Sequence, residues 1–326
     1  MPINHYHYLR PEIVALLESD EIFAKTEQQP TRYSYAEAML ELGEKNPKVV
    51  VLDADVSKSI KTSEFAEKFP ERSFNFGVAE QNMMAAAAGM ATTGLIPYAT
   101  TYAVFASMRA LDMVRNSIHY PKLNVKIAAS HGGITPGPDG VTHQGQEDLS
   151  IIRAIANSTI IAPADPATTK LAVWAAAEYE GPVYLSFTRD PVPAIFDLNY
   201  PFEIGKAITL RDGSDATIIA NRDLVVQALI AAEHLAKRGL DVGVIDCHTL
   251  KPLDVDSVRE NAQECNNKVI AVEDHYCSAF ASILSTVLRD VWYLCVRDIP
   301  RSGKPEELLR HYGIDALSIV QRVEQI

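Results

Sequence analysis

The residue best suited to acid–base chemistry in the first half of the chain is Glu80, in the segment Asn75-Phe-Gly-Val-Ala-Glu-Gln-Asn-Met-Met84. It opens a run made almost entirely of Ala, Met and Gly, which predicts a helix over residues 80–90. A glutamate in a first helical turn stabilises the helix macrodipole, so Glu80 alone has an ordinary structural explanation. A functional carboxyl on an apolar helix is the alternative, and this residue alone does not decide between them.

A second segment, Tyr98-Ala-Thr-Thr-Tyr-Ala-Val-Phe105, contains two aromatic rings at a regular spacing. Tyr102 and Phe105 are three residues apart, which predicts a shared face of a helix. Aromatic residues at this spacing usually pack in a core, so the segment taken alone indicates no more than packing.

The third segment is the loop His131-Gly-Gly-Ile-Thr-Pro-Gly-Pro-Asp-Gly-Val-Thr-His-Gln144, which is too rich in Gly and Pro to be helical. It carries His131, Asp139 and His143, and titratable side chains on such a loop indicate a site more often than packing. The two histidines are twelve residues apart, which matches no standard zinc spacing. We therefore expect no metal ligands in this chain.

The elements that must position these segments alternate between short apolar strands and helices. Strands are expected at 48–52, 73–76, 124–129, 159–162, 183–187, 216–220, 242–245 and 268–272. Helices are expected at 11–25, 33–45, 80–90, 104–119, 167–180, 224–238, 254–264, 279–289, 305–312 and 316–323. This alternation predicts an α/β fold with mostly parallel sheets flanked by helices.

A proline-rich stretch at 191–201 interrupts the alternation and predicts a boundary near residue 195. We expect an N-terminal arm at 1–30, a first domain at 31–192, a linker at 193–205 and a second domain at 206–326.

Composition excludes several classes of function. A net charge of −12 argues against a nucleic-acid surface, although it leaves room for a small basic pocket. The four cysteines form no Cys-x-x-Cys pair and suit a reducing compartment. The N-terminus lacks the pattern of a signal peptide, and the longest apolar stretch is too short and too interrupted to span a bilayer. We expect a cytoplasmic protein that binds neither membrane nor nucleic acid.

Taken together, the motifs resemble the transketolase family in order and spacing, from about Arg32 to the end of the chain. The motifs are Gly77-Val-Ala-Glu-Gln81, Thr101-Tyr-x-x-Phe105, Asp139-Gly-x-Thr-His-Gln144, Gly213-Ser-Asp-Ala-Thr-Ile-Ile-Ala220, His248-Thr-Leu-Lys-Pro-Leu-Asp254 and Val272-Glu-Asp-His275. The resemblance implies a pyrimidine-binding domain followed by the transketolase C-terminal domain. It also implies transfer of a two-carbon ketol unit from a ketose phosphate to an aldose, which is the work of a transferase of aldehyde or ketone residues.

The family's cofactor is thiamine diphosphate, and the resemblance assigns residues to it. Glu80 matches the catalytic carboxyl that hydrogen-bonds the aminopyrimidine ring, and its apolar helix suits a carboxyl whose protonated form must be accessible. Tyr102 and Phe105 match the aromatic wall that stacks on that ring. Asp55-Val56 matches the family's Asp-Leu beside the thiazolium, with a smaller side chain than the usual leucine.

Substrate residues are implied in the same way. His143 matches the histidine that contacts donor hydroxyls and assists proton transfer, and Asp139 matches the aspartate that reads the hydroxyl configuration. The positions that hold the sugar phosphate in the family are occupied here by Arg32, Ser59, His131 and Arg189. Arginine suits this role because its planar fork binds two phosphate oxygens at once.

The family's diphosphate-binding domain has no counterpart in the chain. Its magnesium signature, Gly-Asp-Gly followed by Asn, does not occur. The resemblance therefore implies a split enzyme, in which a separate N-terminal subunit binds magnesium and the diphosphate. The expected assembly is an α2β2 heterotetramer, and this chain alone should be inactive.

Two stretches, Ala220-Asn-Arg-Asp223 and His275-Tyr-Cys-Ser-Ala-Phe-Ala281, depart from the family pattern, and we expect them to lie away from the active site. Three alternatives stay open. One is the beta subunit of a 2-oxoacid dehydrogenase, which lacks the Asp-Gly-x-Thr-His-Gln segment. The others are an enzyme like 1-deoxyxylulose-5-phosphate synthase and a non-catalytic subunit with the same fold. The donor and acceptor sugars are not predicted.

Overall fold

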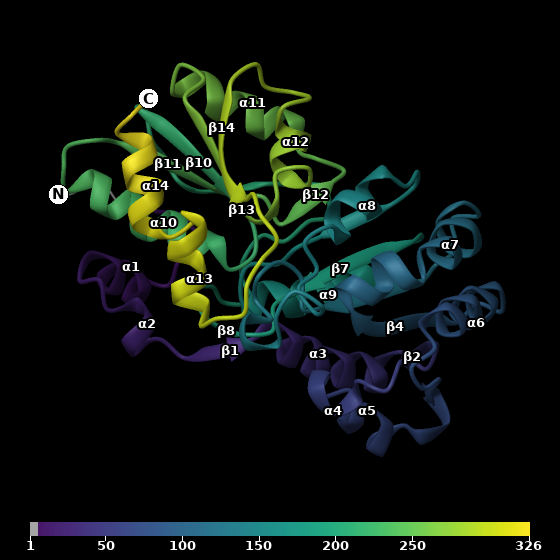
Figure 1. Ribbon diagram of the computed structural model, residues 1–326. Helices are drawn as coiled ribbons and strands as arrows, with labels where there is room; N and C mark the ends of the chain where they lie inside the picture. Colours follow the sequence, from purple (N-terminus) through teal and green to yellow (C-terminus); the bar gives the residue numbers. More distant parts are fainter. Residues whose placement is uncertain (1–5) are drawn as a thin grey trace.

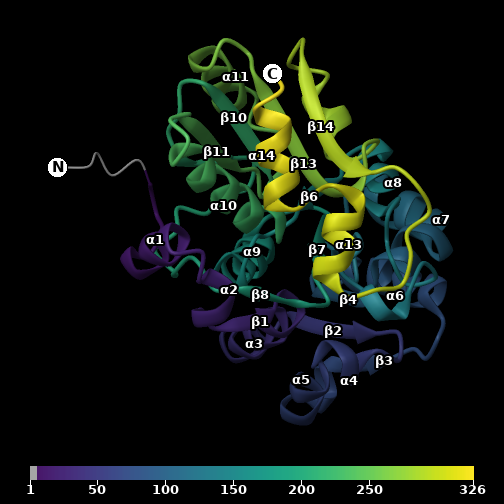
Figure 2. The same cartoon turned by 60° about the vertical axis from the view of Figure 1, so that its left-hand side comes forward.

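A computed structural model describes residues 6–326 and shows two α/β units (Figures 1 and 2). The first unit contains a seven-stranded sheet of order β12-β6-β7-β5-β4-β2-β3. Neighbouring strands of this sheet are parallel, except that β12 is antiparallel to β6. Its strands are β2 (Val49–Asp53), β3 (Ser73–Asn75), β4 (Ile96–Tyr102), β5 (Lys126–Ser130), β6 (Thr159–Ile161), β7 (Val183–Phe187) and β12 (Thr249–Lys251).

Helices cover both faces of this sheet, as the near-continuous burial of its central strands requires. They are α3 (Thr31–Lys45), α4 (Ser57–Ile60), α5 (Ser63–Lys68), α6 (Glu80–Thr92), α7 (Leu111–Met113), α8 (Asp148–Ala154) and α9 (Pro166–Glu178). On one face α3 and α9 pack with β2 and β7, and on the other α6 packs with β4 and β5. The predicted α/β fold is confirmed.

The second unit has a five-stranded sheet of order β14-β13-β10-β11-β9, parallel except for β9. Its strands are β9 (Ile208–Arg211), β10 (Ala216–Ala220), β11 (Val242–Asp246), β13 (Val269–Tyr276) and β14 (Val291–Val296). Its helices are α10 (Leu224–Ala236), α11 (Val255–Glu264), α12 (Phe280–Leu284), α13 (Pro305–Tyr312) and α14 (Ala316–Val323). In Figure 1 this unit lies above the first, with α13 reaching down from it.

Two connections join the two units, through β12 and through the N-terminal arm, and a short strand pair lies near the boundary between them. Strand β12, which belongs to the second half of the chain, extends the sheet of the first unit. Strands β1 (Gln28–Pro30) and β8 (Pro191–Pro193) pair antiparallel, so the stretch predicted as a linker begins as a strand. The N-terminal arm packs against the second unit, because Ile13 and Leu17 of α1 (Pro11–Glu18) share a core with α10.

Several predicted elements differ from the structure. The helix expected at 11–25 is two helices, α1 and α2 (Ile22–Lys25), separated by Asp20 with a φ of 59°. The helix expected at 279–289 ends at Leu284 and is followed by turns and by β14 (Val291–Val296), which was not predicted. Among the described residues, no helix is long and apolar enough to cross a membrane.

The helix expected at 104–119 is irregular. It consists of π-helical turns at Phe105–Arg109 and Val114–His119, separated by α7. Such turns are rare and occur mostly at functional sites, because the extra residue per turn redirects side chains. Tyr102 precedes this segment as the last residue of β4, so the prediction that Tyr102 and Phe105 share a helical face is wrong. The strand forms because Tyr and Thr at 98–102 favour a buried pleated surface.

Candidate active site

The predicted site residues lie along the carboxyl edge of the first sheet. Asp55 and Val56 follow β2, Tyr102 ends β4, His131 follows β5 and Arg189 follows β7. In a parallel sheet the carboxyl ends of the strands meet at one edge, where ligands of open α/β folds usually bind. The topology therefore gathers residues that are more than 130 positions apart in the sequence.

One part of this edge is positively charged and polar. Arg32, in the first turn of α3, donates to Ser59 Oγ at 3.0 Å, and the Tyr102 hydroxyl donates to the same oxygen at 3.0 Å. Burial, together with the charge of Arg189, lowers the pKa of Arg32, while Tyr33, Tyr102 and Asp190 oppose the shift. The Arg32 Nε is buried without a hydrogen-bond partner in the described part of the chain. An unpaired buried donor beside a hydroxyl suits an anionic ligand.

The loop residues meet this cluster from the other side. Arg189 Nε lies 2.9 Å from Asp139 Oδ2, and His131 Nε2 lies 3.8 Å from the same oxygen. His131 is 1% exposed, and its Nδ1 hydrogen-bonds Ser130 Oγ at 2.9 Å. Burial, reinforced by the charge of Arg32 and Arg189, holds the pKa of His131 far below its ordinary value. His131 is therefore neutral at physiological pH and can hydrogen-bond without carrying charge.

Four rings form the centre of the site. The Tyr102 and His131 rings are 3.9 Å apart between centroids and inclined by 33°. His143 meets the Tyr102 and Phe105 rings edge-on at 5.9 and 5.8 Å, and the Tyr102 and Phe105 rings are 5.9 Å apart. Tyr102 and Phe105, predicted to form an aromatic wall, thus lie next to each other at a strand end and in a π-helical turn.

Glu80 is the first residue of α6 and is 1% exposed. Both of its carboxylate oxygens accept from Arg109 Nη1, at 2.9 and 3.0 Å. The Arg109 guanidinium lies over the Phe105 ring at 4.4 Å from its centroid, which links the carboxylate to the aromatic wall. Arg109 was missed by the sequence reasoning, although its position four residues after Phe105 was a usable signal.

The turn that carries Asp55 and Val56 depends on a second residue that was missed, Asp53. Its carboxylate accepts from Val56 N at 2.9 Å and from Thr62 Oγ1 at 3.1 Å, and burial raises its pKa. These bonds hold Asp55 at a φ of 65°, where Asn75 Nδ2 reaches its Oδ1 at 3.4 Å. Sequence reasoning had no signal for Asp53, since an aspartate that ends a strand is common.

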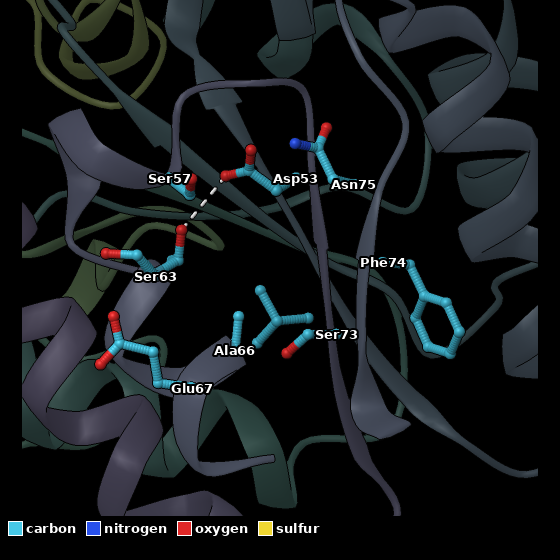
Figure 3. A pocket seen from close by; sticks show the side chains of 10 residues that line it. Asp53, Ser57, Ser63, Ala66, Glu67, Ser73, Phe74 and Asn75 are labelled. Atoms are coloured by element: carbon cyan, nitrogen blue, oxygen red, sulfur yellow. Dashed lines mark hydrogen bonds between the residues drawn. The ribbon is translucent and has the colours of Figure 1, made fainter. Parts of the chain in front are cut away.

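Behind this turn lies a cavity of about 360 Å³ (Figure 3). Asp53 and Asn75 stand at one end of it, and Ser63, Glu67 and Phe74 line the remainder. None of the predicted site residues lines this cavity, so it is separate from the aromatic cluster.

The contacts above connect nearly all of the predicted site residues into one cluster. The connected residues are Arg32, Ser59, Glu80, Tyr102, Phe105, His131, Asp139, His143 and Arg189. Val56 joins only by packing against the hydrophobic core that also contacts Tyr102, and Asp55 contacts Asn75 instead.

The residues present fit a flat heteroaromatic ring. The buried carboxyl of Glu80 is joined to the Phe105 ring through Arg109, its only side-chain hydrogen-bond partner in the described chain, and the Arg109 side chain is 44% exposed. Such a set offers stacking surfaces and one hydrogen-bonding carboxyl. Among residues 6–326, no group of three or more His, Cys, Asp or Glu side chains could hold a metal ion.

Family models confirm the relationship that the motifs suggested. The transketolase pyrimidine-binding domain matches residues 27–194, and the transketolase C-terminal domain matches residues 205–319. The chain belongs to the transketolase family.

Known relatives match nearly the whole chain. A putative transketolase C-terminal section from Methanocaldococcus jannaschii is 44% identical, over 90% of this chain and 94% of the relative. A 6-deoxy-6-sulfo-D-fructose transketolase subunit SqwH from a Clostridium species is 35% identical, over 93% of this chain and 96% of the relative. Human transketolase is 33% identical over 90% of this chain but only 48% of its own length, so the chain spans about half of that relative.

A solved structure described as a split gene transketolase, inactive beta4 tetramer, superposes with a TM-score of 0.85. The two sequences are 44% identical, and the match covers 91% of this chain and 97% of the chain in that structure. The transketolase of Campylobacter jejuni superposes with a TM-score of 0.81 at 23% identity, which shows the shared fold.

Proposed function

We propose that this chain is one subunit of a split, thiamine-diphosphate-dependent transketolase that transfers a two-carbon ketol unit from a ketose phosphate to an aldose. Its pyrimidine-binding domain would span residues 31–192 and its C-terminal domain residues 206–326, joined by the segment 193–205. The single observation that carries the proposal is the buried carboxyl of Glu80, linked through Arg109 to the neighbouring Phe105 and Tyr102 rings.

Each residue of the cluster has a part in this proposal. When bound, thiamine diphosphate supplies a thiazolium carbon that, once deprotonated, can take up the two-carbon unit. Tyr102 and Phe105 would stack on the aminopyrimidine, and Val56 would support the bent cofactor beside Asp55. Glu80 would leave Arg109 and hydrogen-bond the ring, holding a proton there.

The substrate would lie between the rings and the charged edge. His143, half-buried beside the Tyr102 and Phe105 rings, would exchange protons with the hydroxyls of the donor sugar. Asp139 would accept hydrogen bonds from those hydroxyls, while Arg32, Ser59, His131 and Arg189 would hold the phosphate. A sulfonate is also a compact anion, and the relative named for 6-deoxy-6-sulfo-D-fructose makes a sulfosugar the second candidate substrate.

The partner is proposed to be an N-terminal, diphosphate-binding subunit that holds magnesium and the diphosphate, in an α2β2 assembly. The lack of a Gly-Asp-Gly motif and the likeness to a protein named as a transketolase C-terminal section support this.

The test is the variant Glu80→Gln, reconstituted with the diphosphate-binding subunit and assayed with ketose phosphate donors. We expect kcat to fall by about two to four orders of magnitude, the usual range for loss of an acid–base group. Glu64→Gln is the matched control, because Glu64 lies in the first turn of α5 but is exposed. Unchanged turnover in Glu80→Gln would indicate a non-catalytic subunit, and acylation of a lipoyl domain would indicate a 2-oxoacid dehydrogenase.

A further inference from the structure

Arg222 lies in the turn between β10 and α10, in a stretch that we expected to lie away from the active site. The structure shows that this expectation is wrong. Arg222 is fully buried and has a φ of 54°, a left-handed conformation that residues with a side chain rarely adopt. Strained backbone of this kind persists where the surrounding contacts require it, and it concentrates at functional sites.

Those contacts cross from the second unit into the base of the substrate loop, which spans residues 131–145 and carries Asp139 and His143. Arg222 Nη2 donates to the Gly132 carbonyl at 2.9 Å, and the Arg222 amide donates to the Ala162 carbonyl at 3.3 Å. The approach is so close that a Cβ on Gly132 would lie 2.7 Å from Arg222 Nη1. The guanidinium is thus packed directly against the turn that follows His131.

A chain of buried charges fixes the guanidinium. Asp274 Oδ1 lies 3.6 Å from Arg222 Nη1 and 2.9 Å from His275 Nδ1. His275 Nε2 lies 3.0 Å from Asp148, whose carboxylate accepts from the Tyr184 hydroxyl at 2.7 Å. Asp148 and Tyr184 belong to the first unit, so this series of buried contacts extends from the second unit into the first. A buried cation is held in this way only when several partners compensate its lost hydration.

The turn at Gly132 controls the whole substrate loop. Gly133 N donates to the Gly145 carbonyl at 2.7 Å, and Gly145 N donates to the His131 carbonyl at 3.1 Å. These bonds close the base of a loop that carries Asp139 and His143 between its ends. A shift of the Gly132 carbonyl therefore moves His131 at one end and His143 at the other.

We propose that Arg222 is a positioning residue, which holds the base of the substrate loop from the C-terminal domain and keeps His131 buried against Tyr102. It touches neither cofactor nor substrate. Productive geometry at an active site must be held within a fraction of an ångström, and a strained, buried arginine at this turn supplies such a fixed contact.

The protonation of His131 reports this positioning directly. The charged and titratable groups that face it are Arg32 from α3, Tyr102 at the end of β4, Arg189 after β7, and Asp139 and His143 from the loop. Burial and the two arginines keep His131 neutral. If the loop base loosens, water reaches the ring, and its pKa returns toward the ordinary value of about 6.5.

The experiment titrates the histidine rings by NMR in the full chain, for the native protein and for Arg222→Gly and Arg222→Lys, with His131→Gln to assign the signal. We expect His131 not to titrate between pH 5 and 8 in the native protein, and to titrate near pH 6 in Arg222→Gly. A lysine at position 222 cannot reach both Gly132 and Asp274, so in Arg222→Lys we expect His131 to titrate at a lower pH than in Arg222→Gly. The matched control is Asn266→Gly, because Asn266 has the same φ of 54° but is exposed.

A second measurement rests on the proposed function. In the reconstituted enzyme, Arg222→Gly should lower kcat/KM about tenfold or more at pH 7 and move the acid limb of its pH profile upward. If the native enzyme is inactive, the proposed function fails, while the titration still decides the role of Arg222. A folded Arg222→Gly protein whose His131 stays silent would overturn the positioning role. If Arg222→Gly does not fold, a His131 that does not titrate in folded Arg222→Lys would overturn the positioning role.

Discussion

Gly133→Ala is the substitution whose effect follows most directly from the geometry of the substrate loop. Gly133 has a φ of +65°, and a Cβ built on it would lie 1.8 Å from Asp274 Oδ2 and 2.3 Å from Asp274 Cγ. The carboxylate must therefore move by more than 1 Å, out of its contacts with His275 and Arg222. Neither partner can follow, because both are fully buried.

The expected cost has two parts. An alanine at this φ costs about 1 kcal/mol, whatever its surroundings. Forcing an extra carbon into a packed interior costs about 1–3 kcal/mol more, and weakening a buried ion pair adds about 1 kcal/mol or more. Gly313→Ala isolates the cost of the backbone conformation. Gly313 has a φ of +66°, and a Cβ built on it would lie no closer than 3.9 Å to any neighbouring atom.

We expect Gly133→Ala to lower the free energy of unfolding by about 2–4 kcal/mol more than Gly313→Ala does. Equilibrium urea unfolding followed by fluorescence measures both variants, because Trp174 in α9 and Trp292 in β14 place one fluorophore in each unit. A difference of less than about 0.5 kcal/mol between the variants would show that Asp274 moves freely, and would refute the reasoning about a rigid loop base.

Two further predictions concern the same region. Burial alone would lower the pKa of His275, but the Asp274 and Asp148 carboxylates outweigh it and raise that pKa to about 9. His275 therefore contributes stability that is complete below pH about 6.5 and is lost as the pH rises through 9. In urea unfolding, the free energy of unfolding of the native protein should exceed that of His275→Gln, and this difference should shrink by up to about 3 kcal/mol between pH 6 and 9.5. An advantage that is constant with pH would contradict a charged His275. Tyr102→Phe keeps the ring but loses the hydrogen bond to Ser59 at 3.0 Å, so KM for a phosphorylated donor should rise severalfold with kcat nearly unchanged. An equal rise in KM for the unphosphorylated sugar would place Ser59 outside the phosphate site.

Much of the fold could be predicted from local patterns. The β-branched run at 49–53 and the Ala-rich run at 80–92 are unambiguous, and β2 and α6 lie where they were expected. Tyr102 was placed in a helix because a Tyr-x-x-Phe spacing fits both a helical face and a strand end. Strand β12 could not be predicted, because its partner β6 is about 90 residues away and belongs to the other unit.

The candidate site residues also separate into those that local sequence motifs indicate and those that depend on distant contacts. Glu80, His131, Asp139 and His143 were found because they lie within short motifs of unusual composition. Arg109, Asp53 and Arg222 were missed because their roles depend on contacts between distant segments. The clearest case is Arg222, whose bond to Gly132 spans 90 positions of the sequence.

The C-terminal domain holds the substrate loop from two sides, and this bears on why the two domains stay in one chain. Arg222 fixes the loop base from within, while the segment between β14 and α13 lies along its outer part (Figure 2). There Gln144 Nε2 donates to the Arg301 carbonyl at 3.2 Å, and Gly303 N donates to the Gly137 carbonyl at 3.3 Å. A loop this rich in glycine would lose much conformational entropy on ordering, and contacts made before the substrate arrives remove that cost from binding. If the two domains were expressed as separate chains, the charged edge of the sheet would remain, but the loop that completes it would lose both of its supports.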